Sequence, residues 1–218
     1  MASELKSLLT ELNTAVTRKQ FDTVNSLLTR AKRTLLLSNA LIPTPTTSPD
    51  LLPLAREILE LGALAAIRQT DAPIFIRYYQ QLQPFYDIER DPNDATPVDS
   101  KSSPSQRSKI TGLYLLLLLS SGDGTSFHTV LEGLVEEASL KGKSVEDDTF
   151  IKYPVDLERN LMEGSYDKVW RETNSERVPS EDFALFSNVC LLLGLLWCGV
   201  LMLLGPCWNH SQRNRRLL

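Results

Sequence analysis

Apolar residues recur every three or four positions along most of the chain, which is the spacing of one face of an α-helix. The clearest case is the first run, from Leu5 through Leu8 and Leu12 to Val16. By this criterion we expect helices at residues 3–16, 21–35, 54–70, 72–86, 109–120 and 127–138, and another that opens at Pro179. The pattern therefore predicts an all-α fold.

Two polar stretches interrupt the helical pattern. Ile42–Pro53 contains four prolines and is predicted to be an extended connector. Asp87–Ser108 is polar, contains three further prolines, and is predicted to be a long mobile loop. Between this loop and the next turn, the helix expected at 109–120 carries an unbroken run, Leu115–Leu119. We expect it to be buried on every side, and it is too short to cross a bilayer.

The stretch Tyr153–Trp170 predicts two short helices folded back on each other. Pro154 suits the first turn of a helix, and Leu157 and Leu161 then lie one turn apart on one face. Gly164 can adopt the left-handed conformation that ends a helix. Beyond it, Tyr166, Val169 and Trp170 have the spacing of a second apolar stripe.

The same hairpin pattern occurs 145 positions earlier in the chain. The matching pairs are Leu12 with Leu157, Val16 with Leu161, Phe21 with Tyr166, Asp22 with Asp167 and Val24 with Val169. This similarity predicts stacked helix pairs, each of which needs a neighbour to bury its apolar face. A chance likeness between two amphipathic hairpins is the alternative.

The charge balance and the positions of the cysteines indicate which kinds of partner and which cellular compartment to expect. The chain has 23 Lys and Arg against 27 Asp and Glu, and residues 189–218 hold three of the arginines and no acid. An acidic body disfavours a nucleic-acid partner, because phosphate binding needs clustered positive charge. The N-terminus does not look like a signal peptide, and all three cysteines lie after residue 189, so the body is expected to be intracellular.

No combination of residues predicts a reaction. There is no nucleophile elbow, zinc-spaced Cys/His set or glycine-rich dinucleotide turn, and Gly142-Lys143-Ser144 lacks the preceding glycine of a phosphate loop. A structural role is expected for His128, a solvated loop for Asp147-Asp148, and a solvated basic face for Arg30, Lys32 and Arg33. We therefore predict a protein that is not an enzyme and has no metal or cofactor.

Several stretches resemble one known family. They are IKYPVDLERNLMEGSYDKVW at 151–170, APIFIRYYQQLQPFYD at 72–87, LYLLLLLSSG at 113–122 and FHTVLEGL at 127–134. Together they resemble the smallest PCI-type non-ATPase subunits of the 26S proteasome regulatory-particle lid, over about residues 1–188. Through this resemblance, eight residues are assigned to a structural signature of the family: Tyr153, Pro154, Leu157, Leu161, Met162, Gly164, Tyr166 and Val169.

The resemblance implies a right-handed stack of antiparallel helical hairpins, of the tetratricopeptide-like kind, that leads into a winged helix. It implies a non-catalytic scaffold that binds other lid subunits, supports ubiquitin-dependent degradation, and occurs in cytoplasm and nucleus. Related scaffolds in translation initiation factor three and in the signalosome share the architecture, so a subunit of one of those complexes is an alternative.

The chain departs from the family pattern after Asn188. Residues 189–218 are strongly apolar and then basic, where the family would continue into its winged helix. One interpretation is a tail of different origin, such as a frame or splicing alteration, with the winged helix missing. Another is a membrane segment at 183–204 in a tail-anchored helical adaptor, since that length is enough to span a bilayer and three arginines follow it.

Overall fold

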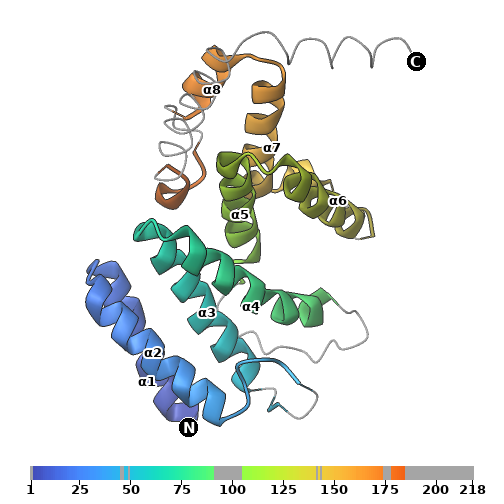
Figure 1. The fold of residues 1–218 in the computed structure, drawn as a ribbon. Coiled ribbons are helices and arrows are strands. Elements are labelled where there is room, and N and C mark those ends of the chain that lie inside the picture. Colours follow the sequence, from blue (N-terminus) through green and yellow to red (C-terminus); the bar gives the residue numbers. More distant parts are fainter. Residues whose placement is uncertain are drawn as a thin grey trace. The chain divides into compact units, whose positions relative to one another are not determined.

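The structure is a computed structural model that describes residues 2–44, 47, 48, 50–90, 105–140, 142, 144–173 and 178–184. Over these residues every regular element is a helix, and none is a strand (Figure 1). The all-α prediction is confirmed. The elements are α1 (Ala2–Thr17), α2 (Phe21–Leu37), α3 (Leu51–Arg68), α4 (Ala72–Arg90), α5 (Arg107–Ser121), α6 (Gly124–Leu140), the 3₁₀ turn η2 (Val145–Asp147), α7 (Thr149–Met162) and α8 (Tyr166–Thr173).

The chain forms two compact units. The first comprises Met1–Tyr114 and Val145–Lys152, and the second comprises Leu115–Ser144 and Tyr153–Leu218. In the first unit α1 pairs with α2 and α3 pairs with α4, and α3 also packs against both helices of the first pair (Figure 1). Because α3 has neighbours on several sides, nearly all of its residues from Ala55 to Ile67 are buried.

Four consecutive helix pairs are joined by the same type of turn. In each, one residue has a positive φ: Lys19 (57°), Thr70 (58°), Gly122 (74°) and Gly164 (72°). Its N–H donates to the carbonyl three residues back, as from Gly164 to Leu161 (3.1 Å), and the next N–H reaches five residues back, as from Ser165 to Asn160 (2.9 Å). These two bonds define the Schellman motif that closes a helix.

The side chains around these turns also correspond. Seven residues before the positive-φ residue lies a buried apolar side chain, and five residues after it lies another. The preceding set is Leu12, Ala63, Leu115 and Leu157, and the following set is Val24, Phe75, Phe127 and Val169. Each of these eight is at most 2% exposed. The similarity expected between two hairpins 145 residues apart is therefore shared by four hairpins. This recurrence supports a helical-repeat fold and not a chance likeness.

Two connectors are shorter than the sequence suggested. The connector expected over Ile42–Pro53 ends earlier because α3 begins at Leu51, with Pro53 in its first turn, where a missing N–H leaves no carbonyl unpaired. The two ends of the loop expected from Asp87 to Ser108 are helical, because α4 includes residues up to Arg90 and α5 starts at Arg107. The rest of that predicted loop, residues 91–104, lies outside the described part of the chain.

Helix α7 starts one turn earlier than predicted. Pro154 was expected in the first turn but lies inside the helix, where it costs one backbone hydrogen bond. The earlier start is stabilised by Asp148, whose Oδ1 accepts the N–H of Phe150 at 3.0 Å, and by burial of Ile151 and Tyr153. Asp148 itself precedes the helix and is partly exposed, so it lies in a connecting segment as expected and also caps α7.

The leucine-rich helix is buried along most of its run. Leu115, Leu116, Leu117 and Leu118 follow one another around α5, and none is more than 8% exposed, whereas Leu119 is only partly buried. Among the described residues no helix is both long and apolar enough to cross a membrane. Residues 185–218 lie outside the described part of the chain, and with them the predicted tail and nearly all of the segment 183–204.

Candidate interaction surfaces

The eight signature residues lie on α7, on α8 and in the turn between them. Tyr153, Pro154, Leu157 and Val169 are buried, and Leu161 is partly buried. The Tyr153 ring lies edge-on to Phe183, with 6.0 Å between ring centres. Gly164 has the positive φ that the prediction required. Most of the signature residues thus pack inside the hairpin or shape its turn.

Met162 and Trp170 do not point into the hairpin. Met162 is 72% exposed and Trp170 is 56% exposed. The prediction that Trp170 continues the buried stripe was wrong, because Val169 takes the inward position and the next helical residue is rotated by about 100° from it. Exposed large apolar side chains on an ordered hairpin suit a surface that binds another protein.

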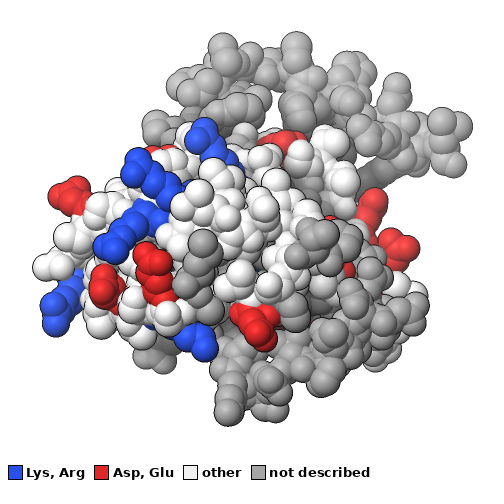
Figure 2. Space-filling model, turned by 90° about the horizontal axis from the view of Figure 1, so that it is seen from below, with Lys and Arg blue, Asp and Glu red and all other residues white. Residues whose placement is uncertain are grey.

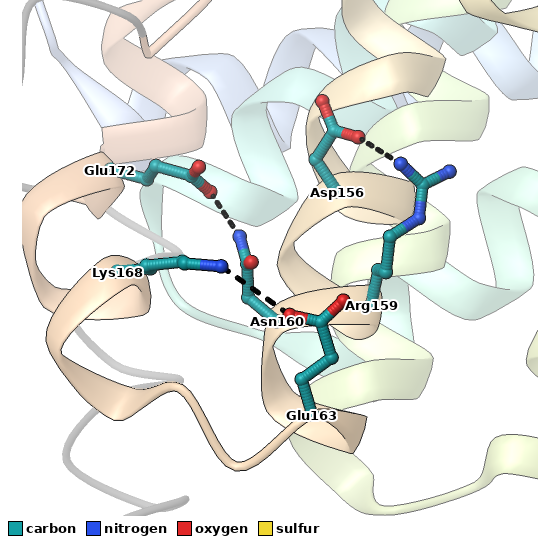
Figure 3. Close-up of polar contacts among 6 residues, drawn as sticks. All are labelled: Asp156, Arg159, Asn160, Glu163, Lys168 and Glu172. Atoms are coloured by element: carbon teal, nitrogen blue, oxygen red, sulfur yellow. Dashed lines mark hydrogen bonds and ion pairs between the residues drawn. The ribbon is translucent and has the colours of Figure 1, made fainter.

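A buried polar contact joins α7 to α8 (Figure 3). Asn160 is only 8% exposed, and its Nδ2 donates to Glu172 Oε2 at 3.0 Å. Two surface ion pairs lie nearby, Arg159 with Asp156 and Lys168 with Glu163, both at 3.4 Å. Exposed pairs contribute little, whereas a buried amide that lost its partner would cost about 1–3 kcal/mol. Sequence reasoning missed Asn160, although a polar residue beside Leu157 and Leu161 on the inward stripe indicates a buried partner.

A groove of about 270 Å³ lies in the first unit, between α2, α3 and α4. Its charged residues are Lys32 on α2, Arg77 on α4 and Asp71 at the start of α4. Lys32 was expected on a solvated face together with Arg30 and Arg33. Those two are exposed, but Lys32 is half-buried, with its Nζ 3.9 Å from the centre of the Tyr78 ring. Burial and the nearby Arg77 lower the pKa of Lys32.

A second buried polar cluster in the first unit centres on Glu60, which is 2% exposed. Its Oε1 accepts hydrogen bonds from the Tyr86 hydroxyl (3.2 Å) and the Gln106 N–H (3.3 Å), and Arg56 Nε lies 3.8 Å away. Burial raises the pKa of Glu60, against the opposing effect of Arg56 and the two donors. The cluster ties the start of α5 to α3, and its groups are enclosed, so its role is structural.

The described residues offer little for catalysis. No group of three or more potential metal ligands lies together among them. His128 has a half-exposed side chain, with its Nε2 3.6 Å from Glu158 Oε1 on α7. Acidic and basic side chains are interspersed on the face drawn in Figure 2, which does not favour a nucleic-acid site there. The regular elements of the described chain are thus mainly helical hairpins.

Comparisons with known proteins show what the chain is similar to. Residues 105–186, which include α5 to α8, match the model of the CSN8/PSMD8/EIF3K family. The chain is 33% identical over 189 residues to the 26S proteasome regulatory subunit RPN12 of Saccharomyces cerevisiae. It is 30% identical over 174 residues to rpn12 of Schizosaccharomyces pombe, and 32% over 170 residues to the 26S proteasome non-ATPase regulatory subunit 8 homolog A of Arabidopsis thaliana. Residues 105–186 thus match this family, and the chain is similar over most of its length to proteasome regulatory subunits.

The matches cover most of this chain but less of its relatives. They include 85%, 80% and 77% of the present chain, and 65%, 57% and 58% of the respective relatives. The chain thus spans less than two thirds of the length of these relatives. The family resemblance inferred from the residues at 151–170 is confirmed, while the eight-residue signature stays a prediction.

Proposed function

We propose that this protein is a non-catalytic scaffold subunit of the lid of the 26S proteasome regulatory particle. The observation that supports this most strongly is the match of 189 residues to a proteasome regulatory subunit at 33% identity. Its task is to hold neighbouring subunits in place and thereby support ubiquitin-dependent protein degradation. It works as a hetero-oligomer with other lid subunits, in the cytoplasm and the nucleus.

The geometry is consistent with such a role. A stack of hairpins presents extended helical surfaces, and its rigidity comes from buried positions such as Leu157 and Val169. The exposed Met162 and Trp170 give the signature hairpin an apolar contact surface. A scaffold needs these surfaces and a stable fold, but no reactive group. We therefore propose that the protein catalyses no reaction itself.

Affinity isolation tests this function directly. The full chain would be expressed with an epitope tag, and proteasomes would be isolated through a different, tagged subunit. We expect the chain to be enriched with the regulatory particle over an untagged control. Equal recovery with and without the tagged proteasome subunit would contradict the proposal.

The same experiment separates the proposal from its nearest alternative. The family model also covers relatives outside the proteasome, as its name CSN8/PSMD8/EIF3K indicates. Parallel isolations of the signalosome and of translation initiation factor three would show whether the chain prefers either of them. A preference for one of these complexes would replace the proteasome assignment while leaving the scaffold role intact.

A further inference from the structure

The groove of the first unit has two helical walls and a floor of small residues. Asn25, Leu28, Thr29 and Lys32 line it from α2, and their spacing puts them on one face of that helix. Ile74, Arg77 and Tyr78 line it from α4 with the same spacing. Between the walls, Gly62 and Ala66 of α3 lie one turn apart, and their small size leaves the space open.

Three groups are stacked at the floor of this groove. The Tyr78 ring lies directly on Gly62, since a Cβ added there would come within 2.6 Å of the ring. The Lys32 ammonium sits over the same ring at 3.9 Å from its centre. This contact holds the lysine in place by a cation–π interaction and restricts its motion, so that less entropy is lost when a ligand binds it.

The cations of the groove have no acidic partner of their own. Among the described residues, neither Lys32 nor Arg77 forms an ion pair or a hydrogen bond, and the two repel each other. Of the described residues that line the groove, Asp71 alone carries a carboxylate, and its Oδ1 already accepts the N–H of Ile74. The groove thus keeps a small positive excess within a chain of net charge −4.

We infer that this groove binds an extended acidic segment of a partner protein, with one carboxylate between Lys32 and Arg77 and an adjacent apolar side chain on Ile74. Ile74 is 43% exposed and lies one turn from Arg77, so both contacts fall within reach of neighbouring residues of one peptide. The two cations supply the charge-assisted hydrogen bonds that a carboxylate accepts.

A polyphosphate ligand such as RNA suits the groove less well. Two cations and one carboxylate match a single negative charge, whereas a nucleic acid would place several phosphates near Asp71 and the acidic body. A peptide with isolated carboxylates avoids this repulsion. The inference concerns the first unit and does not depend on the proteasome assignment.

The test uses the full chain and a labelled octapeptide of alternating glutamate and leucine as the probe. Fluorescence anisotropy would measure its affinity, and amide chemical shifts would show whether Gly62 responds. Comparison peptides replace every glutamate by glutamine or by lysine. We expect the glutamate peptide to bind most tightly and to shift the Gly62 amide.

A charge-reversal pair supplies the matched control. The double variant Lys32→Glu, Arg77→Glu should bind the glutamate peptide about tenfold more weakly and should gain affinity for the lysine peptide. The variant Arg30→Glu, Arg33→Glu makes the same change in net charge on exposed residues outside the groove, and should retain most of the affinity. Circular dichroism would confirm that both variants are folded.

Three results would overturn the inference. One is equal affinity for the glutamate and glutamine peptides, or no binding of either. Another is an equal loss of affinity in the groove variant and in the Arg30, Arg33 control, which would indicate a diffuse charge effect. The third is tighter binding of a single-stranded RNA of similar length that also shifts the Gly62 amide, which would assign the groove to a nucleic acid.

Discussion

Replacing Gly164 by alanine isolates the backbone cost of the turn between α7 and α8. The residue has φ of 72°, and an added Cβ would meet no atom within 4 Å, so no steric clash contributes. The left-handed conformation costs a residue with a Cβ about 1–2 kcal/mol. Alanine recovers about 0.4–1 kcal/mol because it restricts the unfolded chain. The free energy of unfolding should therefore fall by roughly 0.5–1 kcal/mol.

A second glycine provides the control for this substitution. Gly133 lies in the exposed interior of α6, and a Cβ there also meets nothing within 4 Å. Because its backbone is helical, Gly133→Ala should raise the free energy of unfolding by about 0.8–1 kcal/mol. The same chemical change thus has opposite signs at the two positions.

Thr70 allows the reverse experiment. It occupies the corresponding position of the turn between α3 and α4 with φ of 58°, which is unfavourable for a β-branched residue. Thr70→Gly should therefore raise the free energy of unfolding, by about 0.5 kcal/mol once the added entropy of the unfolded glycine is deducted. Urea unfolding followed by far-UV circular dichroism measures all three variants. A Gly164→Ala protein as stable as the wild type, or a destabilised Thr70→Gly protein, would refute the shared-turn geometry.

Four other substitutions test the burial of individual side chains. Leu157→Ala should lower the free energy of unfolding by about 2–5 kcal/mol, because the Leu157 side chain is only 2% exposed. Met162→Ala should change it by at most about 0.5 kcal/mol, because Met162 is 72% exposed. Similar losses in the two variants would contradict the burial assigned to these residues. Gly62→Ala should cost about 1–3 kcal/mol, measured by thermal melting, since its Cβ would overlap the Tyr78 ring. The pKa of Glu60 in the folded protein is raised above 4.5, so the folded state binds the proton of this carboxyl more tightly than the unfolded state does. The stability gained from this protonation is present in full below pH 4.5 and is lost as the pH rises through the folded-state pKa. The stability advantage of the wild type over Glu60→Gln, measured by urea unfolding across this range, should therefore shrink toward neutral pH, and an advantage that grew would contradict the buried site.

The helices and one hairpin could be predicted because they depend on local periodicity. The helix expected at 72–86 is α4, and its residues Phe75, Tyr78, Tyr79 and Leu82, which recur at helical spacing, are buried. The start of α4 was also recognised correctly, since Asp71 caps it through the N–H of Ile74 at 3.2 Å.

The fourfold recurrence of the turn was only partly visible in the sequence. Gly164 directly indicates the end of a helix, but Lys19 and Thr70 adopt the same left-handed conformation although they are not glycine. No local rule points to them, because these residue types usually avoid positive φ. Packing of the flanking buried residues stabilises the strained backbone there, and packing is a tertiary property.

The groove could not be predicted at all. It brings together Lys32, Gly62 and Arg77 from three helices that are far apart in the sequence. Taken singly, Lys32 looked like one of several exposed basic residues, and Gly62 like an unremarkable helical position. These residues line one groove only because of the way α2, α3 and α4 pack together. The spacing of apolar residues alone does not specify that packing.

Native mass spectrometry of isolated regulatory particles tests the central claim most directly. The full chain would be expressed beside a tagged proteasome subunit, and the intact particles would be weighed and dissociated. If the protein is a scaffold subunit of the lid, it should be present in the particles as a stoichiometric component. Leu157→Ala should lower the fraction of particles that contain the chain, whereas Met162→Ala should leave the hairpin folded. Particles that never contain the chain, although it is expressed and folded, would contradict the account.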